Sequence, residues 1–301
     1  MQILWLIVAV LTLSGGNILS GLYSKKVKCS DVYVYTLFSA SAGMLFFFAV
    51  NGFSFVFHTE TLLYAMLFAL CYLCAVMFYI LALKRGPLSI TALVYSYALI
   101  VPTLFGIVFY KDATDALFYI AFALLLISLF LINVKPKGGE NLPEDREEEN
   151  GKGKKANFLW GIFLAVAFLG NGFCSVVQSY HQRLFAGAYK SEFMIFALLA
   201  VMLVNCLFVF CLPQRRARLS AVKRSWYWGA CGGVINAALN LSTMMIVSAG
   251  SMPLSLLFPV EAAGNLIIVY LFSLLALKEK LCAAQHAGFV FGMASIILFN
   301  I

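Results

Sequence analysis

The sequence predicts an all-α membrane protein of about ten transmembrane helices in two inverted five-helix repeats. Its hydrophobic content, the length of its apolar runs and the position of one charged segment all point to this fold class. Hydrophobic residues make up 63% of the 301 residues and charged residues only 11%, whereas a soluble domain carries about 25% charge. A soluble fold of this size could not bury so much apolar surface. The lipid bilayer is therefore its expected solvent.

The apolar runs favour helices over a β-barrel. Backbone polar groups in a bilayer must pair internally, which leaves helices or closed barrels as spanning structures. Barrel strands alternate apolar and polar residues, whereas runs such as LFFFAVNGFSFVF do not alternate. Since a span needs about 20 apolar residues, the predicted spans are 3–23, 32–51, 61–83, 88–110, 113–134, 157–180, 191–212, 226–248, 253–276 and 282–300.

One long polar segment divides the chain. Residues 135–155 carry six acidic and six basic side chains together with glycine and proline. Such a segment cannot bury enough apolar area to fold by itself, so we interpret it as a flexible linker on the cytoplasmic side. The predicted domains are a first five-helix repeat over 1–134, a charged linker over 135–156 and a second repeat over 157–301.

The distribution of Lys and Arg predicts the orientation. If the N-terminus lies outside, 18 of the 21 basic residues fall on the cytoplasmic side, and only Lys111, Arg183 and Lys190 lie outside. Cytoplasmic loops of membrane proteins are enriched in these residues. We therefore expect a multi-pass protein of an inner or plasma membrane with both termini outside. The net charge of +8 then serves topology and does not indicate a nucleic-acid partner.

The two halves resemble each other at corresponding places. Pro87-Leu88-Ser89 opens a span that ends at Tyr110-Lys111-Asp112, and Pro253-Leu254-Ser255 opens one that ends at Leu277-Lys278-Glu279. Because each repeat has an odd number of spans, the second half would enter the membrane upside down relative to the first. Inverted repeats of this kind recur in secondary transporters, whose solute site lies near the midplane.

These motifs resemble those of the drug/metabolite transporter superfamily, specifically its EamA-type ten-helix members, over nearly the whole chain. The residues that carry the resemblance are Gly16-Asn17 and Gly170-Asn171, the two Pro-Leu-Ser openings, Lys111-Asp112, Lys278-Glu279 and the mid-span Pro102. The second half departs from the pattern, since Ile268 occupies the place that corresponds to Pro102.

The resemblance implies a permease that works by alternating access. The expected function is secondary transport, with export of a small metabolite, an amino acid or an amphipathic compound. A lipid-linked sugar translocator is an alternative, since smaller members of the superfamily have that role. A structural or sensory membrane protein without transport activity is another alternative.

Glu261 is the one acidic residue deep inside a predicted span, eight residues after Pro253. A charged carboxyl in hydrocarbon costs on the order of 3 kcal/mol or more, so Glu261 should face a cavity or a partner. It could bind a substrate amine or couple protons. It could instead be a protonated acid that is hydrogen-bonded between helices. Asn265 lies four residues further on and shares its helix face.

Other polar residues near span centres are candidates for lining a pathway. They are Asn236 and Asn240 in the eighth span, Asn17 and Asn171 in the first and sixth, and Tyr95 and Tyr97 in the fourth. Tyr95 corresponds to Glu261 when both are counted from the matched prolines, and an aromatic wall opposite a carboxyl suits a cationic or amphipathic solute. Interhelical packing is the alternative for each of them, because asparagine also holds membrane helices together.

Several kinds of chemistry lack a sequence signal. No GxxxxGK[ST] motif is present, so ATP is not an expected partner. An intramembrane enzyme usually needs clustered ionisable groups, and Glu261 stands alone, so we expect no enzyme. The histidines and cysteines show no metal spacing, so we expect no metal and no cofactor. The expected partners are the bilayer, a small solute and a coupling ion, for which the proton is a candidate.

Overall fold

The structure is a computed structural model of the full chain. It describes residues 2–26, 32–83, 94–95, 97–132, 152–211, 215–250, 252–276 and 282–299. These residues form helices joined by short turns, with no strand among them. The predicted all-helical fold is confirmed for this part of the chain.

The helices follow the predicted apolar runs closely. Their bounds are α1 Gln2–Lys26, α2 Val32–Val50, α3 Thr59–Leu83, η1 Tyr97–Leu99, α5 Ile100–Phe109, α6 Ala116–Ile132, α7 Lys152–Leu184, α8 Lys190–Cys211, α9 Arg215–Ser248, α10 Leu254–Leu275 and α11 Ala283–Phe299. Within the described residues, seven helices are long and apolar enough to cross a membrane: α1, α2, α3, α7, α8, α9 and α10. The chain is thus a multi-pass α-helical membrane protein.

Three further apolar helices, α5 with η1, α6 and α11, are shorter. They coincide with the predicted fourth, fifth and tenth spans. The total of ten spans therefore stays a prediction, as does the inverted repeat.

Side chains located just before α6 and α3 cap the first turns of these helices. The Asp115 carboxylate accepts a 2.8 Å hydrogen bond from the Phe118 backbone N–H at the start of α6. His58 does the same at the start of α3, where its Nδ1 accepts from the Thr61 backbone N–H at 3.3 Å. Both residues thereby satisfy an N–H that the first turn of a helix leaves without an intrahelical partner.

Two prolines, Pro102 and Pro259, have different local roles. Pro102 lies in the first turn of α5, directly after the 3₁₀ turn η1, where the missing N–H breaks no helical hydrogen bond. Pro259 lies inside α10 and cannot donate to the Ser255 carbonyl one turn earlier. Pro102 therefore lies at a helix start and Pro259 in a helix interior.

Helix α7 begins at Lys152, so the last five residues of the predicted linker are helical. The other residues of the predicted linker, 135–151, lie outside the described residues. Helix α9 likewise begins at Arg215, eleven residues before the predicted span, whereas its apolar part starts at Ser225. Both differences have one cause: a helix continues into polar sequence beyond the membrane when nothing there breaks it.

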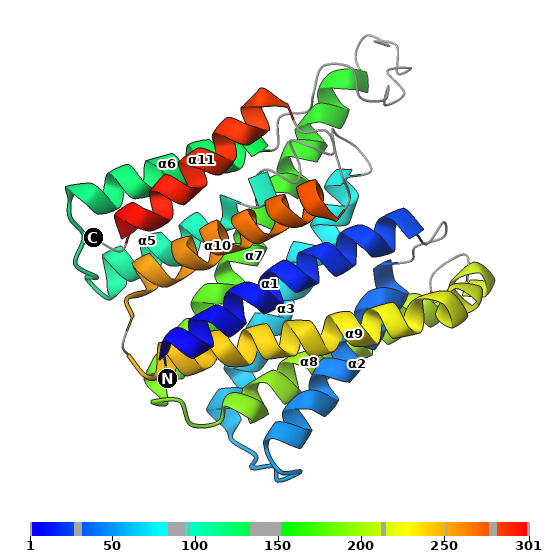
Figure 1. The fold of residues 1–301 in the computed structure, drawn as a ribbon. Coiled ribbons are helices and arrows are strands. Elements are labelled where there is room, and N and C mark those ends of the chain that lie inside the picture. Colours follow the sequence, from blue (N-terminus) through cyan, green and yellow to red (C-terminus); the bar gives the residue numbers. More distant parts are fainter. Residues whose placement is uncertain are drawn as a thin grey trace. The chain divides into compact units, whose positions relative to one another are not determined.

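The helices form two compact units, and each unit draws on both halves of the sequence. Unit 1 comprises Met1–Leu70 and Val177–Pro253, and unit 2 comprises Cys71–Val176 and Leu254–Ile301. Helices α3 and α7 contribute one part of their length to each. In unit 1, α9 packs along both α1 and α2, and α2 also packs on α8 (Figure 1). The units are defined by packing, whereas the predicted repeats are defined by sequence similarity. Their boundaries therefore need not coincide.

Small residues bring α2 and α9 close together in unit 1. An added Cβ at Gly233 would lie 2.2 Å from the Ser39 carbonyl oxygen, and one at Gly229 would lie 2.7 Å from the Tyr35 carbonyl oxygen. Gly229, Gly233 and Ala237 recur every four residues, and such spacing places small residues on one helix face. Close backbone approach through small residues is a common way for membrane helices to associate.

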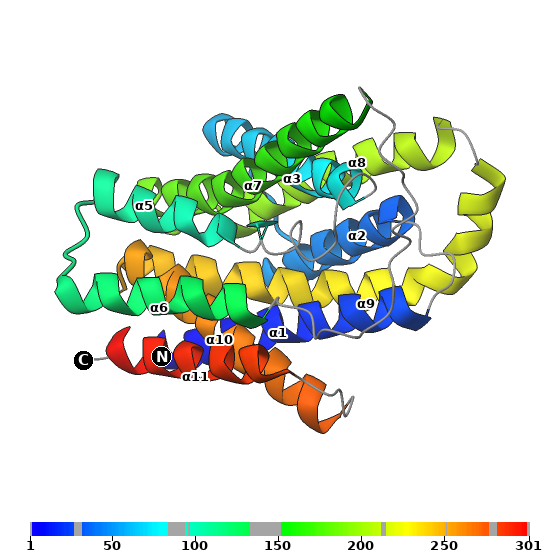
Figure 2. The ribbon, with the colours of Figure 1, turned by 90° about the horizontal axis from the view of Figure 1, so that it is seen from above.

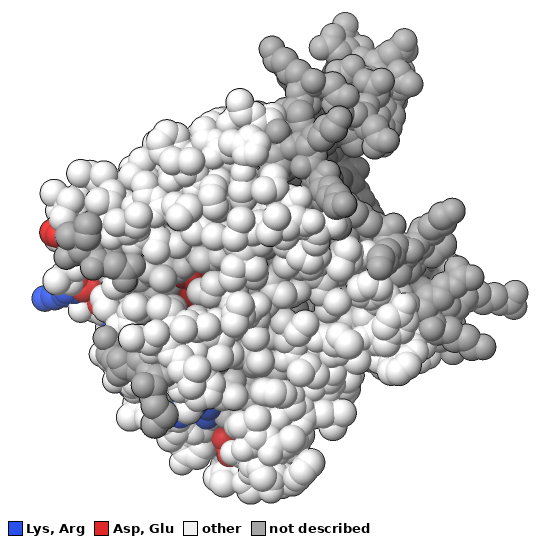
Figure 3. Space-filling model, in the orientation of Figure 1, with Lys and Arg blue, Asp and Glu red and all other residues white. Residues whose placement is uncertain are grey.

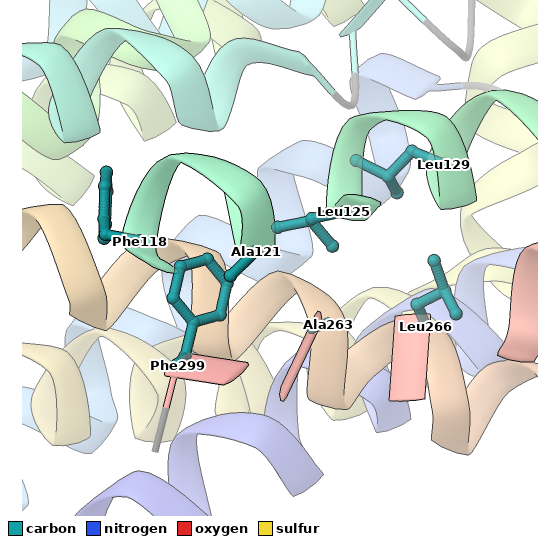
Figure 4. Packing of buried hydrophobic residues seen from close by; sticks show 7 residues of the cluster. All are labelled: Phe118, Ala121, Leu125, Leu129, Ala263, Leu266 and Phe299. Carbon is teal, nitrogen blue, oxygen red and sulfur yellow. The ribbon is translucent and has the colours of Figure 1, made fainter. Parts of the chain in front are cut away.

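In unit 2, α6 packs along α11, and α5 packs along α10 (Figure 2). Leu125 of α6 is fully buried in a cluster with side chains from α10 and α11 (Figure 4). The labelled members are Phe118, Ala121, Leu125, Leu129, Ala263, Leu266 and Phe299. Two hydrogen bonds hold the same helices: Ser128 Oγ donates to the Gly288 carbonyl at 2.5 Å and Ser295 Oγ to the Ala121 carbonyl at 2.8 Å.

Large apolar side chains lie on the described surface. On the face drawn in Figure 3, Lys, Arg, Asp and Glu atoms occupy only a few small areas. Many large apolar side chains are exposed, for example Leu45 at 61% and Val290 at 61%. This is the surface expected of helices whose outer faces contact lipid rather than water.

Candidate functional site

Glu261 is buried in α10, two residues after the helix-interior Pro259, and its exposed fraction is 6%. Asn265 lies one turn further along the same helix and is partly buried. The prediction that these two residues share a helix face follows directly from the helical geometry of α10. Their predicted roles in binding or coupling remain predictions.

The start of α10 is held by a carboxylate from another segment of unit 2. The Ser255 backbone N–H donates to Asp112 Oδ2 at 3.0 Å. Asp112 follows α5, and its oxygen occupies space that a side chain at Gly106 would fill, since an added Cβ there would lie 2.5 Å from Oδ2. Two motif residues of the sequence analysis, Asp112 and Ser255, are thereby in direct contact.

Asn236 and Asn240 lie on one face of α9 and are bonded to each other. Asn240 Nδ2 donates to Asn236 Oδ1 at 2.9 Å and to the Asn236 carbonyl at 2.8 Å. Asn236 is exposed within unit 1 and Asn240 is partly buried. The buried Gln178 of α7 donates through Nε2 to the Asn240 carbonyl at 3.2 Å. The structure therefore places a small group of amides around the middle of the α9 span.

The two tyrosines of the predicted fourth span have different surroundings. The Tyr97 hydroxyl donates to the Leu126 carbonyl of α6 at 2.7 Å, so it holds η1 to α6. Tyr95 stacks obliquely against Tyr79 of α3, with ring centroids 4.4 Å apart. Tyr97 thus makes a packing contact between helices, and Tyr95 belongs to an aromatic pair; their lining of a pathway stays a prediction.

The predicted site residues fall into both units. Asn17 lies in α1 and, with Asn236 and Asn240, belongs to unit 1, whereas Asn171, Tyr95, Tyr97, Glu261 and Asn265 belong to unit 2. Asn17 is exposed and Asn171 is partly buried. Within the units, the structure brings Asn236 and Asn240 into contact.

Sequence reasoning missed a polar chain in unit 1 that contains two histidines. His181, in the last turn of α7, is fully buried, as are Gln182 beside it and Thr61 of α3. His181 Nε2 lies 3.1 Å from Thr61 Oγ1, and His181 Nδ1 lies 3.0 Å from Gln182 Nε2. Thr61 Oγ1 is also 3.1 Å from Nδ1 of His58. Four side chains therefore form one hydrogen-bonded chain, which we call the histidine chain.

The direction of each bond in the histidine chain follows from its donors. The Gln182 amide nitrogen can only donate, so His181 Nδ1 accepts and His181 Nε2 carries the proton. That proton points to Thr61 Oγ1, which leaves the Thr61 hydroxyl to donate to His58. Nδ1 of His58 must accept, because the Thr61 backbone N–H also points to it. Rotating the Gln182 amide by half a turn would reverse the first bond.

Aromatic rings enclose the histidine chain. Phe193 of α8 stacks on His181 with ring centroids 4.5 Å apart and an interplanar angle of 25°. Tyr189 stacks on His58 at 4.5 Å and 10°. Phe185 contacts both histidines. The predicted orientation could have signalled this pairing, because His58 precedes the third span and His181 ends the sixth, and both of these ends are predicted outside.

No family model matches the sequence, and no curated protein matches it either. The chain is similar in fold to solved structures, with 27 matching chains. One of them, described only as a "crystal structure of protein", has a TM-score of 0.70 at 14% identity, over 98% of this chain and 94% of that one. At this level of identity the likeness concerns the fold alone.

Proposed function

We propose that this protein is a secondary transporter that moves a small solute across an inner or plasma membrane by alternating access. The observation that carries the proposal is Glu261, an acidic side chain that is 6% exposed within a helix long and apolar enough to span a membrane. Placing a carboxyl there costs on the order of 3 kcal/mol or more, and intramembrane ionisable residues usually mark solute or ion pathways.

The amides of α9 add to this support. Asn236 is an exposed polar residue in a span that extends from Ser225 to Ser248. An amide in contact with lipid tails would lose hydrogen bonds that a polar pathway could supply. The bonded pair Asn236 and Asn240 is therefore a candidate solute-binding surface, and Glu261 is a candidate partner for a solute amine or for a proton.

The proposal includes a membrane topology. It has ten spans in two inverted repeats of five, with both termini outside and a charged cytoplasmic linker. The contact between Asp112 and Ser255 joins the end of the span that Pro87 opens to the start of the span that Pro253 opens. Such a contact is consistent with two spans that correspond to each other in related halves. The resemblance to EamA-type members of the drug/metabolite transporter superfamily supports the same arrangement, and it supports export of a metabolite, an amino acid or an amphipathic compound.

Solute flux tests the proposal. The purified chain would be reconstituted into liposomes loaded with a mixture of amino acids and amphipathic amines, and release would be followed by mass spectrometry. At least one compound should leave faster than it leaves protein-free liposomes, and Glu261→Gln should lose that flux. Release equal to that of protein-free liposomes for every compound would contradict the proposal and would favour a lipid-linked substrate or a structural or sensory role.

A further inference from the structure

The histidine chain joins a fully buried imidazole to a partly exposed one through a single hydroxyl. His181 is 0% exposed, as are Thr61 and Gln182, whereas His58 is partly exposed at the start of α3. Imidazole is the side chain whose protonation changes most readily near neutral pH. A buried imidazole with a hydrogen-bonded route outward can take up and release a proton without opening the fold.

We propose that His181 binds a proton and exchanges it with water through the Thr61 hydroxyl and His58. As the coupling site of a carrier, this inference rests on the proposed function; as a proton-binding site, it stands on the geometry of unit 1 alone. It would also leave Glu261 available to a solute amine.

Gln182 can support both protonation states of His181. In the described arrangement its amide nitrogen donates to the neutral ring, and its Oε1 is buried without a hydrogen-bond partner among the described residues. Rotating the amide by half a turn would bring Oε1 to the ring and let it accept a proton on Nδ1. A buried carbonyl oxygen that lacks a partner is costly, and protonation of His181 would supply one.

Two helix ends decide which histidine holds the proton. His181 lies in the last turn of the 33-residue helix α7, where the negative end of the helix dipole stabilises a cation. His58 caps the start of α3 with Nδ1, where the positive end of the dipole disfavours a cation and protonation at Nδ1 would break the cap. His58 is thus suited to pass a proton and His181 to keep it. The face of Phe193 on His181 adds a favourable cation–π contact.

Release of the proton proceeds in balanced steps. From an imidazolium at His181, with the Gln182 oxygen on Nδ1–H, the Nε2 proton passes to Thr61 Oγ1 while the Thr61 hydroxyl proton passes to His58 Nδ1. His58 then loses its Nε2 proton to water, and its Nδ1 returns to the cap after tautomerisation. The neutral His181 that remains carries its proton on Nδ1, held by the Gln182 oxygen, while the Thr61 hydroxyl now donates to Nε2. Uptake is the reverse sequence, and no other reactant is required.

Other ionisable groups lie on the elements packed against His181. On and before α3 they are His58, Glu60 and Tyr64; on α7 they are Tyr180 and Arg183; between α7 and α8 and on α8 they are Tyr189, Lys190 and Glu192. Glu192 accepts a 2.9 Å bond from Asn51, and Lys190 donates to the Gly187 carbonyl. Neither of these two contacts involves His181, whereas Tyr64 contacts its ring with centroids 5.9 Å apart. The chain through Thr61 is the hydrogen-bonded route that links His181 to another titratable group, His58.

Nitrogen NMR of the full chain, with ¹⁵N-labelled histidine in lipid nanodiscs, tests the inference without any solute. The chain has three histidines, so His58→Gln, His181→Gln and His286→Gln assign the signals. As the pH is lowered, the His181 signal should move from the neutral form to the imidazolium. Thr61→Val should slow exchange of the His181 ring protons with water severalfold, and Thr61→Ser should restore it.

Thr103→Val is the matched control. Thr103 is also fully buried, but its hydroxyl bonds to the Leu99 carbonyl one turn earlier in the chain at 2.8 Å, so this variant should leave exchange unchanged. A His181 ring that stays neutral down to the lowest pH at which the protein remains folded would overturn the proposal, as would unchanged exchange in Thr61→Val. Since no solute is needed, a failed flux assay and a failed titration are separate outcomes.

A second measurement tests coupling. In the flux assay with amino acids and amines, an imposed pH gradient should accelerate release by the native chain, and His181→Gln should lose that acceleration. Acceleration of the same size in His181→Gln would overturn the coupling role.

Discussion

The carboxylate of Asp112 caps helix α10 from outside that helix, since its Oδ2 accepts the backbone N–H of Ser255 at 3.0 Å. The two residues are 143 positions apart in the sequence, yet both belong to motifs that the two halves share. Capping by a residue so distant fixes the start of α10, the helix that carries Glu261, relative to the end of α5. Gly106 leaves the space that the carboxylate occupies.

Asp112→Ala should destabilise the protein by about 1 kcal/mol, the usual cost of losing a helix-capping side chain. Thermal unfolding of the purified protein in detergent would measure the loss. Asp112→Asn is the control, because it keeps an acceptor oxygen and should lose less. Equal stability of the alanine variant and the native chain would show that the cap contributes nothing.

Gly233→Ala should destabilise unit 1, because the new methyl group would lie 2.2 Å from the Ser39 carbonyl oxygen. Overpacking of this kind costs about 1–3 kcal/mol, and the unfolding temperature should fall accordingly. Gly161→Ala is the matched control, since nothing lies within 4 Å of an added Cβ there, and helix propensity favours alanine. A fall of the same size in both variants would contradict the close approach of α2 and α9.

Tyr97→Phe should lower stability by about 0.5–1.5 kcal/mol through loss of its hydrogen bond to the Leu126 carbonyl, and should leave solute flux unchanged. Tyr95→Ala should instead alter the concentration dependence of flux if Tyr95 lines the pathway, because it removes a ring from the pair with Tyr79. Unfolding and flux assays on the same preparations separate the two effects. Loss of flux in Tyr97→Phe at unchanged stability would show that the Tyr97 hydroxyl takes part in transport.

Glu261→Gln should abolish flux, since the amide keeps the shape of the side chain but can neither pair with a solute amine nor carry a proton. Glu60→Gln is the control because Glu60 is exposed at the start of α3, and flux should persist in it. Native flux with an unchanged pH profile in Glu261→Gln would remove Glu261 from the mechanism.

The histidine chain shows why the sequence predicted one part of the candidate chemistry and not another. Glu261 could be found from the sequence alone, because a single acidic residue within an apolar run is recognisable without knowledge of the fold. His58 and His181 are separated by more than a hundred residues and lie at span ends, where polar residues are ordinary. Their connection depends on Thr61, an unremarkable residue until helix packing places its hydroxyl between the two rings.

The sequence by itself determined that the chain is helical and crosses a membrane, because backbone groups in lipid must pair within each segment and the apolar runs have the length of a span. Packing decided the rest: that Tyr97 is tied to α6, that Gly229 and Gly233 admit α2, that Asp112 caps α10 and that two histidines share one threonine. A span is specified by local composition, whereas a contact between spans depends on which faces meet, and that is a property of the folded chain.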